Sequence, residues 1–93
     1  MSKELWTLKN KKAVVTGSTR GIGQAVAEEF LKLGAEVMIV SRSQDDVDSE
    51  IERYKKGGYD VHGVKCDVTI GEDREKLIHK TEELWGKLDI LVN

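Results

Sequence analysis

The chain has 93 residues, of which 15 are basic and 17 acidic, so its length suits one small domain and its formal net charge is −2. This near balance gives no reason to expect nucleic acid or an anionic membrane as a partner, and no apolar run approaches the roughly 20 residues that span a bilayer. The start of the chain lacks signal-peptide features and Cys66 is the only cysteine, which excludes an internal disulfide and predicts a cytoplasmic protein.

Short apolar runs alternate along the chain with segments in which apolar residues recur at helical spacing. In chain order, the expected elements are a strand at 13–16, a helix at 22–33, a strand at 37–40, a helix that starts near Asp45 and ends near Gly57, a strand at 61–66, a helix that starts near Glu72 and stops at Gly86, and a strand at 90–92. His62 and Lys65 interrupt the third strand, which suits the edge of a sheet. Trp85 is expected to anchor the third helix.

This alternation of strands and helices predicts a parallel sheet that is covered on both faces. With right-handed crossovers, the common arrangement is a doubly wound, Rossmann-like α/β fold with the strand order 3-2-1-4. Ligands bind to such sheets in a crevice beyond the carboxyl ends of the strands, where the direction of winding reverses. Gly17 and Asn93 would flank that crevice, because each ends one of the two strands beside the reversal.

The segment VVTGSTRGIG places Gly17, Gly21 and Gly23 between the first strand and the first helix. Glycine inside a helix or strand costs about 0.5–1 kcal/mol relative to alanine, so this cluster indicates that the backbone approaches a ligand. A helix N-terminus attracts anions, and a dinucleotide pyrophosphate fits such a place. The spacing G-x-x-x-G-x-G differs from the G-x-G-x-x-G fingerprint. A tight turn without a ligand is the alternative.

Three segments together resemble the short-chain dehydrogenase/reductase family: TGSTRGIG, CDV at 66–68 and LDILVN at 88–93. The similarity covers the whole chain, and the motifs occur in the family's order. In that family a T-G-x-x-x-G-x-G loop opens the chain, and the fourth strand ends in N-N-A-G, of which Asn93 matches the first residue. Within the family, the glycine segment and EDREKL are similar to tropinone-reductase-like members, and 3-oxoacyl carrier-protein reductases and sugar dehydrogenases share most of these elements.

The resemblance implies that residues of all three motifs bind the cofactor: Gly17, Ser18, Thr19, Arg20, Gly21, Ile22, Gly23, Asp67, Val68 and Asn93. The glycines and Ile22 would line the pyrophosphate and the nicotinamide end. Asp67 would hydrogen-bond the adenine amino group, and Val68 would pack on the ring. The backbone of Asn93 would border the cofactor, and Thr16 would tie the glycine loop to the fourth strand.

The residues that follow the second strand predict NADP(H) as the cofactor. A protein that prefers NAD usually carries an acidic residue there, which binds the ribose hydroxyls. This chain has Ser41 and Arg42 instead. Serine offers a hydrogen bond, and a guanidinium can grip a phosphate through two parallel bonds. Arg20 adds a second positive charge in the glycine loop. The alternative interpretation is that Arg42 is a surface residue that contacts only solvent.

Other polar residues are interpreted as structural. His62 and His79 are not at metal-ligand spacing, so no metal site is predicted, and Cys66 fits a small buried thiol. Asp45 and Asp46 fall at the start of the second helix, where the helix dipole favours carboxylates.

The resemblance implies an NADP(H)-dependent oxidoreductase that reduces a carbonyl or oxidises an alcohol by hydride transfer, with a small-molecule substrate and a homo-oligomeric full-length form. The family's catalytic Tyr-x-x-x-Lys pair follows N-N-A-G and does not occur here. We therefore expect residues 1–93 to be the N-terminal part of one dinucleotide-binding Rossmann domain, truncated after the fourth strand. A non-catalytic NADP(H)-binding or redox-sensing module is the alternative. A methyltransferase using S-adenosylmethionine is a third possibility, but it typically needs an acid where Ser41 stands.

Overall fold

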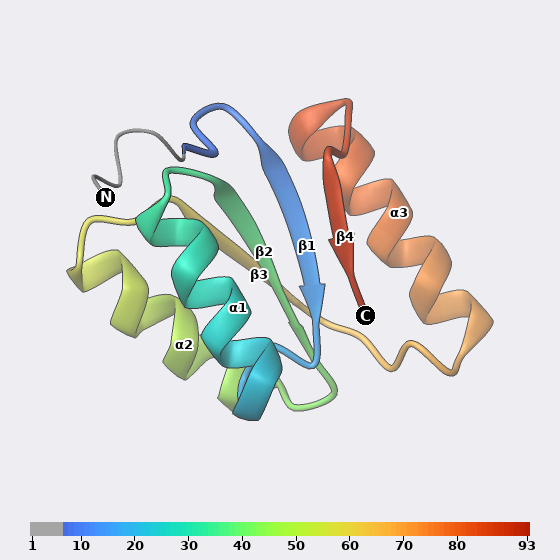
Figure 1. The fold of residues 1–93 in the computed structure, drawn as a ribbon. Helices are drawn as coiled ribbons and strands as arrows, with labels where there is room; N and C mark the ends of the chain where they lie inside the picture. The colour runs from blue at the N-terminus through green and yellow to red at the C-terminus, as the bar shows by residue number, and fades with distance from the viewer. Residues whose placement is uncertain (1–6) are drawn as a thin grey trace.

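The structure is a computed structural model, and it describes residues 7–93. Strands and helices alternate throughout this part of the chain (Figure 1): β1 (Lys12–Thr16), α1 (Gly21–Lys32), β2 (Glu36–Ser41), α2 (Gln44–Lys56), β3 (Val61–Lys65), α3 (Gly71–Trp85) and β4 (Ile90–Val92). All strand pairs are parallel, and their order is β3-β2-β1-β4. The predicted Rossmann-like fold is therefore confirmed, with β3 at one edge of the sheet as expected.

The observed helix starts agree with the predicted ones. α2 begins at Gln44, just before Asp45 and Asp46, and α3 begins at Gly71, just before Glu72 and Asp73. The first turns of both helices are polar and largely exposed. Apolar periodicity detects only the buried side of a helix, so the acidic residues that favour the helix dipole were the signal for these first turns.

Alternate residues of the central strands face opposite layers of helices, because successive side chains of a strand point to opposite faces. α1 and α2 cover one face and α3 covers the other (Figure 1). On the α1 and α2 side, the buried cluster contains Ala13, Val15, Ala27, Leu31, Ala35, Val37, Ile39, Tyr54 and Val61. On the α3 side, it contains Val14, Met38, Val40, Cys66 and Leu77, with Val64 and Trp85 packed against it.

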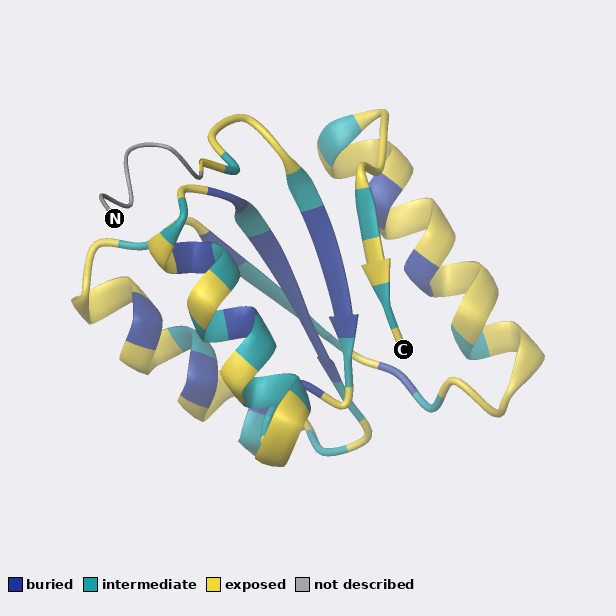
Figure 2. Cartoon of the chain, viewed as in Figure 1, coloured by how far each residue is buried: buried dark blue, intermediate teal, exposed yellow. Residues whose placement is uncertain are grey.

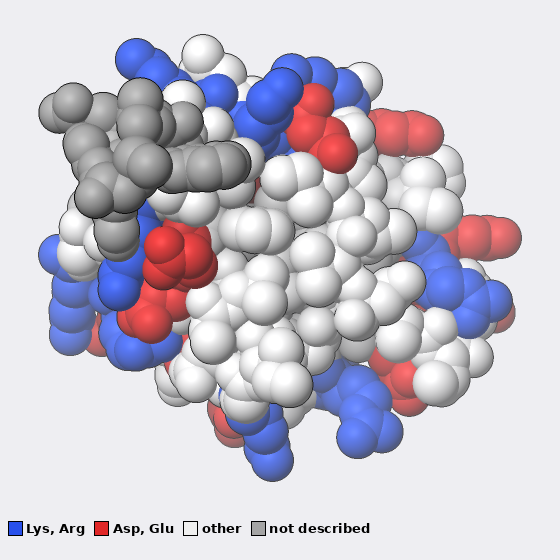
Figure 3. Space-filling view, in the orientation of Figure 1, with Lys and Arg blue, Asp and Glu red and all other residues white. Residues whose placement is uncertain are grey.

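The β4 side of the sheet is more exposed than its centre. β4 pairs with β1 alone in the described sheet, and Leu91 of β4 is 57% exposed. Figure 2 shows buried residues concentrated in β1 and β2, whereas β4 and most of α3 are exposed or intermediate. Figure 3 shows an uncharged area over β1 and β4, with charged side chains around its rim. Among residues 7–93, the helices are all too short or too polar to cross a membrane.

A polar cluster at the amino ends of the strands joins the sheet to the end of α3. The indole N–H of Trp85 donates to Oε2 of Glu36 at 2.6 Å, and Nε2 of His62 lies 3.3 Å from the same oxygen. Lys12 forms an ion pair with Oε1 of Glu36. Glu36, Asp60 and His62 hold ligand-type atoms within 4.8 Å of one another, but both Glu36 oxygens already accept bonds within the protein. Trp85 thus anchors α3, as predicted.

Replacement of Glu36 by glutamine is expected to lower the free energy of unfolding by about 1.5–3 kcal/mol at pH 7, the range for hydrogen bonds to a charged group. Burial opposes ionisation of Glu36, but the hydrogen bonds from Lys12, Trp85 and His62 and the charge of Lys12 outweigh it and lower its pKa below 4.5. Its stabilisation is therefore present above pH 4.5 and is lost as the pH falls through the lower, folded pKa.

Urea unfolding of both proteins between pH 3 and pH 6 tests this prediction. The gap between wild type and Glu36→Gln should be full near pH 6 and shrink toward pH 3. The exposed Glu75 provides the control, because Glu75→Gln should leave the stability within about 0.5 kcal/mol of wild type. A gap for Glu36→Gln that stays constant with pH contradicts the prediction.

Candidate functional site

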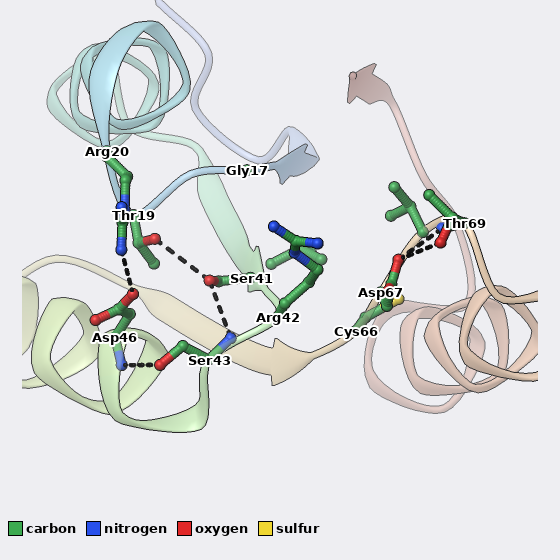
Figure 4. Close-up of a pocket in the computed structure, with 12 residues that line it drawn as sticks. Gly17, Thr19, Arg20, Ser41, Arg42, Ser43, Asp46, Cys66, Asp67 and Thr69 are labelled. Carbon is green, nitrogen blue, oxygen red and sulfur yellow. Dashed lines mark hydrogen bonds and ion pairs between the residues drawn. The ribbon is translucent and has the colours of Figure 1, made fainter.

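A cleft of about 460 Å³ opens at the carboxyl ends of β1, β2 and β3 (Figure 4). Its walls come from three loops: the one between β1 and α1, the one between β2 and α2, and the one between β3 and α3. The lining residues are Gly17, Thr19, Arg20, Val40, Ser41, Arg42, Ser43, Asp46, Cys66, Asp67, Val68 and Thr69.

The glycine loop takes a path that side chains would obstruct. Gly17 has a φ of +61° and turns the chain sharply out of β1. A Cβ on Gly23 would overlap the carbonyl oxygen of Gly17 and lie 3.0 Å from its carbonyl carbon. α1 therefore begins in direct contact with the end of β1.

The N-terminus of α1 differs from that of α2. Arg20 occupies the N-cap position of α1, its side chain does not cap the helix, and the first turn contains no acidic residue. In α2, Ser43 caps the helix, and Asp45 and Asp46 lie in the first turn. The first N–H groups of α1 are therefore not engaged by a capping side chain and can bind an anion. Ile22 projects from this turn and is 85% exposed.

Two hydroxyl groups fix the glycine loop to its neighbouring strands. Ser18 is completely buried, and its Oγ accepts a hydrogen bond from Val40 N–H at 2.9 Å. Its own N–H donates to the Val40 carbonyl at 3.1 Å. Thr16 donates to the carbonyl of Val92 in β4 at 3.2 Å, which is the tie predicted from the sequence. The Ser18 side chain thus holds the loop and does not face the cleft.

The end of β2 presents a hydroxyl and a guanidinium to the cleft. Ser41 Oγ accepts hydrogen bonds from the Thr19 hydroxyl and the Ser43 N–H, both at 3.3 Å. The Ser41 hydroxyl proton therefore remains available to an acceptor in the cleft. Arg42 is exposed, and Figure 4 shows its side chain between the glycine loop and Asp67.

The loop between β3 and α3 holds Asp67 in its ionised form. Thr69 donates to Asp67 Oδ1 from its hydroxyl at 2.6 Å and from its N–H at 3.0 Å. These bonds, with a smaller contribution from the Arg42 charge, lower the pKa of Asp67 below its ordinary value. The first turn of α3 fixes the loop, because Asp73 accepts from Asp67 N–H at 2.9 Å.

Cys66 borders the cleft but is 2% exposed. Its thiol donates to the Asp73 carbonyl, and burial, together with the charges of Asp73 and Asp67, raises its pKa. The thiol therefore stays protonated and unreactive, as a small buried side chain.

The cleft brings together seven of the twelve predicted site residues: Gly17, Thr19, Arg20, Ser41, Arg42, Asp67 and Val68. Asn93 instead lines a second cavity of about 190 Å³ beside α3, which Val68 also borders. Gly21, Ile22 and Gly23 lie in the first turn of α1 beside the cleft, and Ser18 lies beneath it.

Sequence reasoning did not assign Ser43, Asp46 or Thr69 to the site. Ser43-x-x-Asp46 has the form of a helix-capping box directly after a strand. That signal places both residues at the carboxyl end of β2, beside Ser41 and Arg42.

A family model described as short chain dehydrogenase matches residues 11–93. A tropinone reductase homolog from Arabidopsis thaliana is 45% identical to this chain over 89 residues, which is 95% of the chain and 34% of the relative. A tropinone reductase homolog from Datura stramonium is also 45% identical, over 95% of the chain and 33% of the relative. A chloroplastic tropinone reductase homolog from Arabidopsis is 42% identical over 93 residues. The chain spans about a third of the length of these relatives.

The chain is also similar to solved structures of dehydrogenases. The chain superimposes on 2-keto-3-deoxy-D-gluconate dehydrogenase from Streptococcus agalactiae with a TM-score of 0.85 and 38% identity, covering 95% of this chain and 33% of that one. A short-chain dehydrogenase/reductase of unknown function from Caenorhabditis elegans, solved with its cofactor, gives a TM-score of 0.82 and 34% identity, covering 89% of this chain and 32% of that one.

Proposed function

Because the chain belongs to the short-chain dehydrogenase family, we propose that it is the cofactor-binding part of an NADP(H)-dependent oxidoreductase. The bound dinucleotide supplies the hydride chemistry, and a small carbonyl or alcohol compound is the substrate. Tropinone-reductase-like and 3-oxoacyl carrier-protein-reductase-like activities are the proposed subclasses. We also keep the cytoplasmic location and the homo-oligomeric state of the full-length protein as predictions.

The observation that carries this proposal is the charge at the end of β2. Ser41 and Arg42 stand where a carboxylate would favour NAD(H), and Arg20 lies on the facing wall of the same cleft. The Ser41 proton and the two guanidinium groups form a set of donors suited to a phosphate. The extra 2′-phosphate of NADP(H) is the group that such a set would recognise.

The rest of the cleft fits the other parts of a dinucleotide. The N-terminus of α1, which no side chain caps, would hold the pyrophosphate. The backbone there is accessible because Gly17, Gly21 and Gly23 have no side chains. The exposed Ile22 would border the nicotinamide end, near Asn93.

Asp67 and Val68 lie at the opposite end of the cleft from the glycine loop. Thr69 uses Oδ1 of Asp67 and leaves Oδ2 outside that pair of bonds, so Asp67 could accept a bond from the adenine amino group. Val68 is 39% exposed and could pack on the adenine ring.

A non-catalytic NADP(H)-binding or redox-sensing module would use the same cleft. The two functions differ in turnover, because the module would bind NADPH without consuming it when carbonyl compounds are supplied. Measurement of NADPH absorbance with a panel of ketones distinguishes them when it is made on the full-length protein.

Arg42→Asp is expected to weaken NADPH binding by about tenfold or more, because it removes charge-assisted hydrogen bonds and adds a repelling carboxylate. Binding of NADH, which lacks the 2′-phosphate, should change by less than about threefold. Fluorescence titration of wild type and variant with each dinucleotide measures both effects.

Lys76→Asp provides the matched control, because it makes the same charge reversal at an exposed position of α3 away from the cleft. It should leave both affinities within about twofold of wild type, since distant surface charges are screened. Equal affinity of wild type for NADPH and NADH would refute the NADP(H) preference.

A further inference from the structure

We propose that Asp46 is a specificity-determining residue, which competes with the 2′-phosphate of the cofactor for Arg20 and limits the preference for NADP(H) over NAD(H). This inference rests on the proposed function, because it concerns the same cleft. It assigns to Asp46 a role that its place in a helix first turn does not require.

The carboxylate of Asp46 does not make the hydrogen bond that is usual for an acid at its position in a helix. In a capping box, the acid at the third helical position accepts a bond from the N–H of the N-cap residue. Here the N–H of Ser43 donates instead to Ser41 Oγ, at 3.3 Å. Ser43 still caps the helix, because its Oγ accepts from Asp46 N–H at 3.3 Å. The backbone of Asp46 is thus fixed while its carboxylate is free for another partner.

That partner is Arg20, on the other side of the cleft. Nη2 of Arg20 lies 3.3 Å from Oδ2 of Asp46, and the two residues are 26 positions apart in the sequence. Figure 4 shows Arg20 reaching down from the glycine loop to Asp46, while Arg42 lies nearer Asp67. Asp46 therefore faces the same space as Ser41, Arg42 and Arg20.

A phosphate that bound Arg20 would have to displace Asp46 or lie close to it. If the phosphate displaces Asp46, the ion pair between Arg20 and Asp46 is lost. If Asp46 stays in place, its carboxylate repels the phosphate. NAD(H) has no 2′-phosphate and incurs neither cost. The side chain of Arg20 is 84% exposed and that of Asp46 is 39% exposed, so the pair is screened by solvent. Exposed pairs of this kind correspond to at most about a fivefold change in affinity.

Adenosine 2′,5′-bisphosphate and adenosine 5′-monophosphate are suitable probes, because they differ only in the 2′-phosphate. We expect Asp46→Asn to strengthen binding of the bisphosphate about three- to fivefold and to leave the monophosphate within about twofold. Isothermal titration calorimetry at constant ionic strength measures both without any turnover.

The adjacent Asp45 offers a matched control. Asp45→Asn makes the same charge change in the same helical turn, but Asp45 does not line the cleft. It should alter bisphosphate binding by less than about 1.5-fold. In an Arg20→Met background, Asp46→Asn should lose most of its effect, because Asp46 acts through Arg20.

The outcomes separate this inference from the proposed function. If wild type binds the two nucleotides equally, the proposed preference for NADP(H) is wrong, and the proposed role of Asp46 is wrong as well. If wild type prefers the bisphosphate but Asp46→Asn matches Asp45→Asn, only the inference fails. An undiminished effect of Asp46→Asn in the Arg20→Met background also overturns it, because Asp46 would then act without Arg20.

Discussion

Replacement of Gly23 by alanine is expected to weaken NADPH binding by about tenfold or more, because small displacements of a binding backbone have large effects. The added Cβ would overlap the Gly17 carbonyl, and neither backbone can move without reshaping the loop between β1 and α1. Such overpacking should also lower the free energy of unfolding by about 1–3 kcal/mol. Fluorescence titration with NADPH and urea unfolding measure the two effects.

Gly71 is the matched control, because it too lies in the first turn of a helix, α3. A Cβ there would meet only Nη2 of Arg74, at 3.7 Å, which is an ordinary contact. Gly71→Ala should therefore bind NADPH as wild type does and keep its stability within about 0.5 kcal/mol. Unchanged NADPH binding by Gly23→Ala would show that the close approach of α1 to β1 does not shape the site.

Ile39→Ala is expected to lower the free energy of unfolding by about 2–5 kcal/mol. Ile39 lies within β2, is completely buried and belongs to the cluster beneath α1 and α2. Its neighbours in register are Val15 in β1 and Gly63 in β3. Gly63 has no side chain to fill a cavity, so relaxation around the shortened residue is limited. Since small domains have about 5–15 kcal/mol of stability in total, Ile39→Ala would remove a large part of it.

Urea unfolding followed by circular dichroism measures this loss. Ile39→Val, which removes one methylene, should cost about 0.5–1.5 kcal/mol. Ile78 of α3 is 55% exposed, and Ile78→Ala should cost about 0.5 kcal/mol or less. Similar losses for Ile39→Ala and Ile78→Ala would mean that the sheet interior is not the main source of stability.

The sequence was sufficient for the fold because the signals for the fold are local or topological. Apolar runs located all four strands, and helical spacing located the buried sides of all three helices. The right-handedness of the crossovers then left the order 3-2-1-4 as the common solution, and the structure has that order. The exposed first turns of α2 and α3 carry no apolar period, and their acidic residues, which favour the helix dipole, indicated these helix starts instead.

The sequence also placed most of the candidate site at one end of the sheet. Gly17, Ser41 and Asp67 each lie at or just beyond the carboxyl end of a parallel strand, and these ends meet at the same edge of the sheet. Their convergence on one cleft therefore follows from the strand order. The capping pattern at Ser43 and Asp46 was present in the sequence, but it indicated only a helix start.

Only the tertiary structure decided which side chains pair with which. Arg20 and Asp46 are 26 residues apart, and Trp85 and Glu36 are 49 apart. Ser18, in the glycine motif, turned out to be buried against β2 rather than open to the cleft. The period of the apolar residues indicates which face of an element is buried. The partner of a polar side chain depends instead on where the loops and helix ends lie relative to one another. That placement exists only after the sheet has assembled, so the fold could be predicted from the sequence and the pairing of its charges could not.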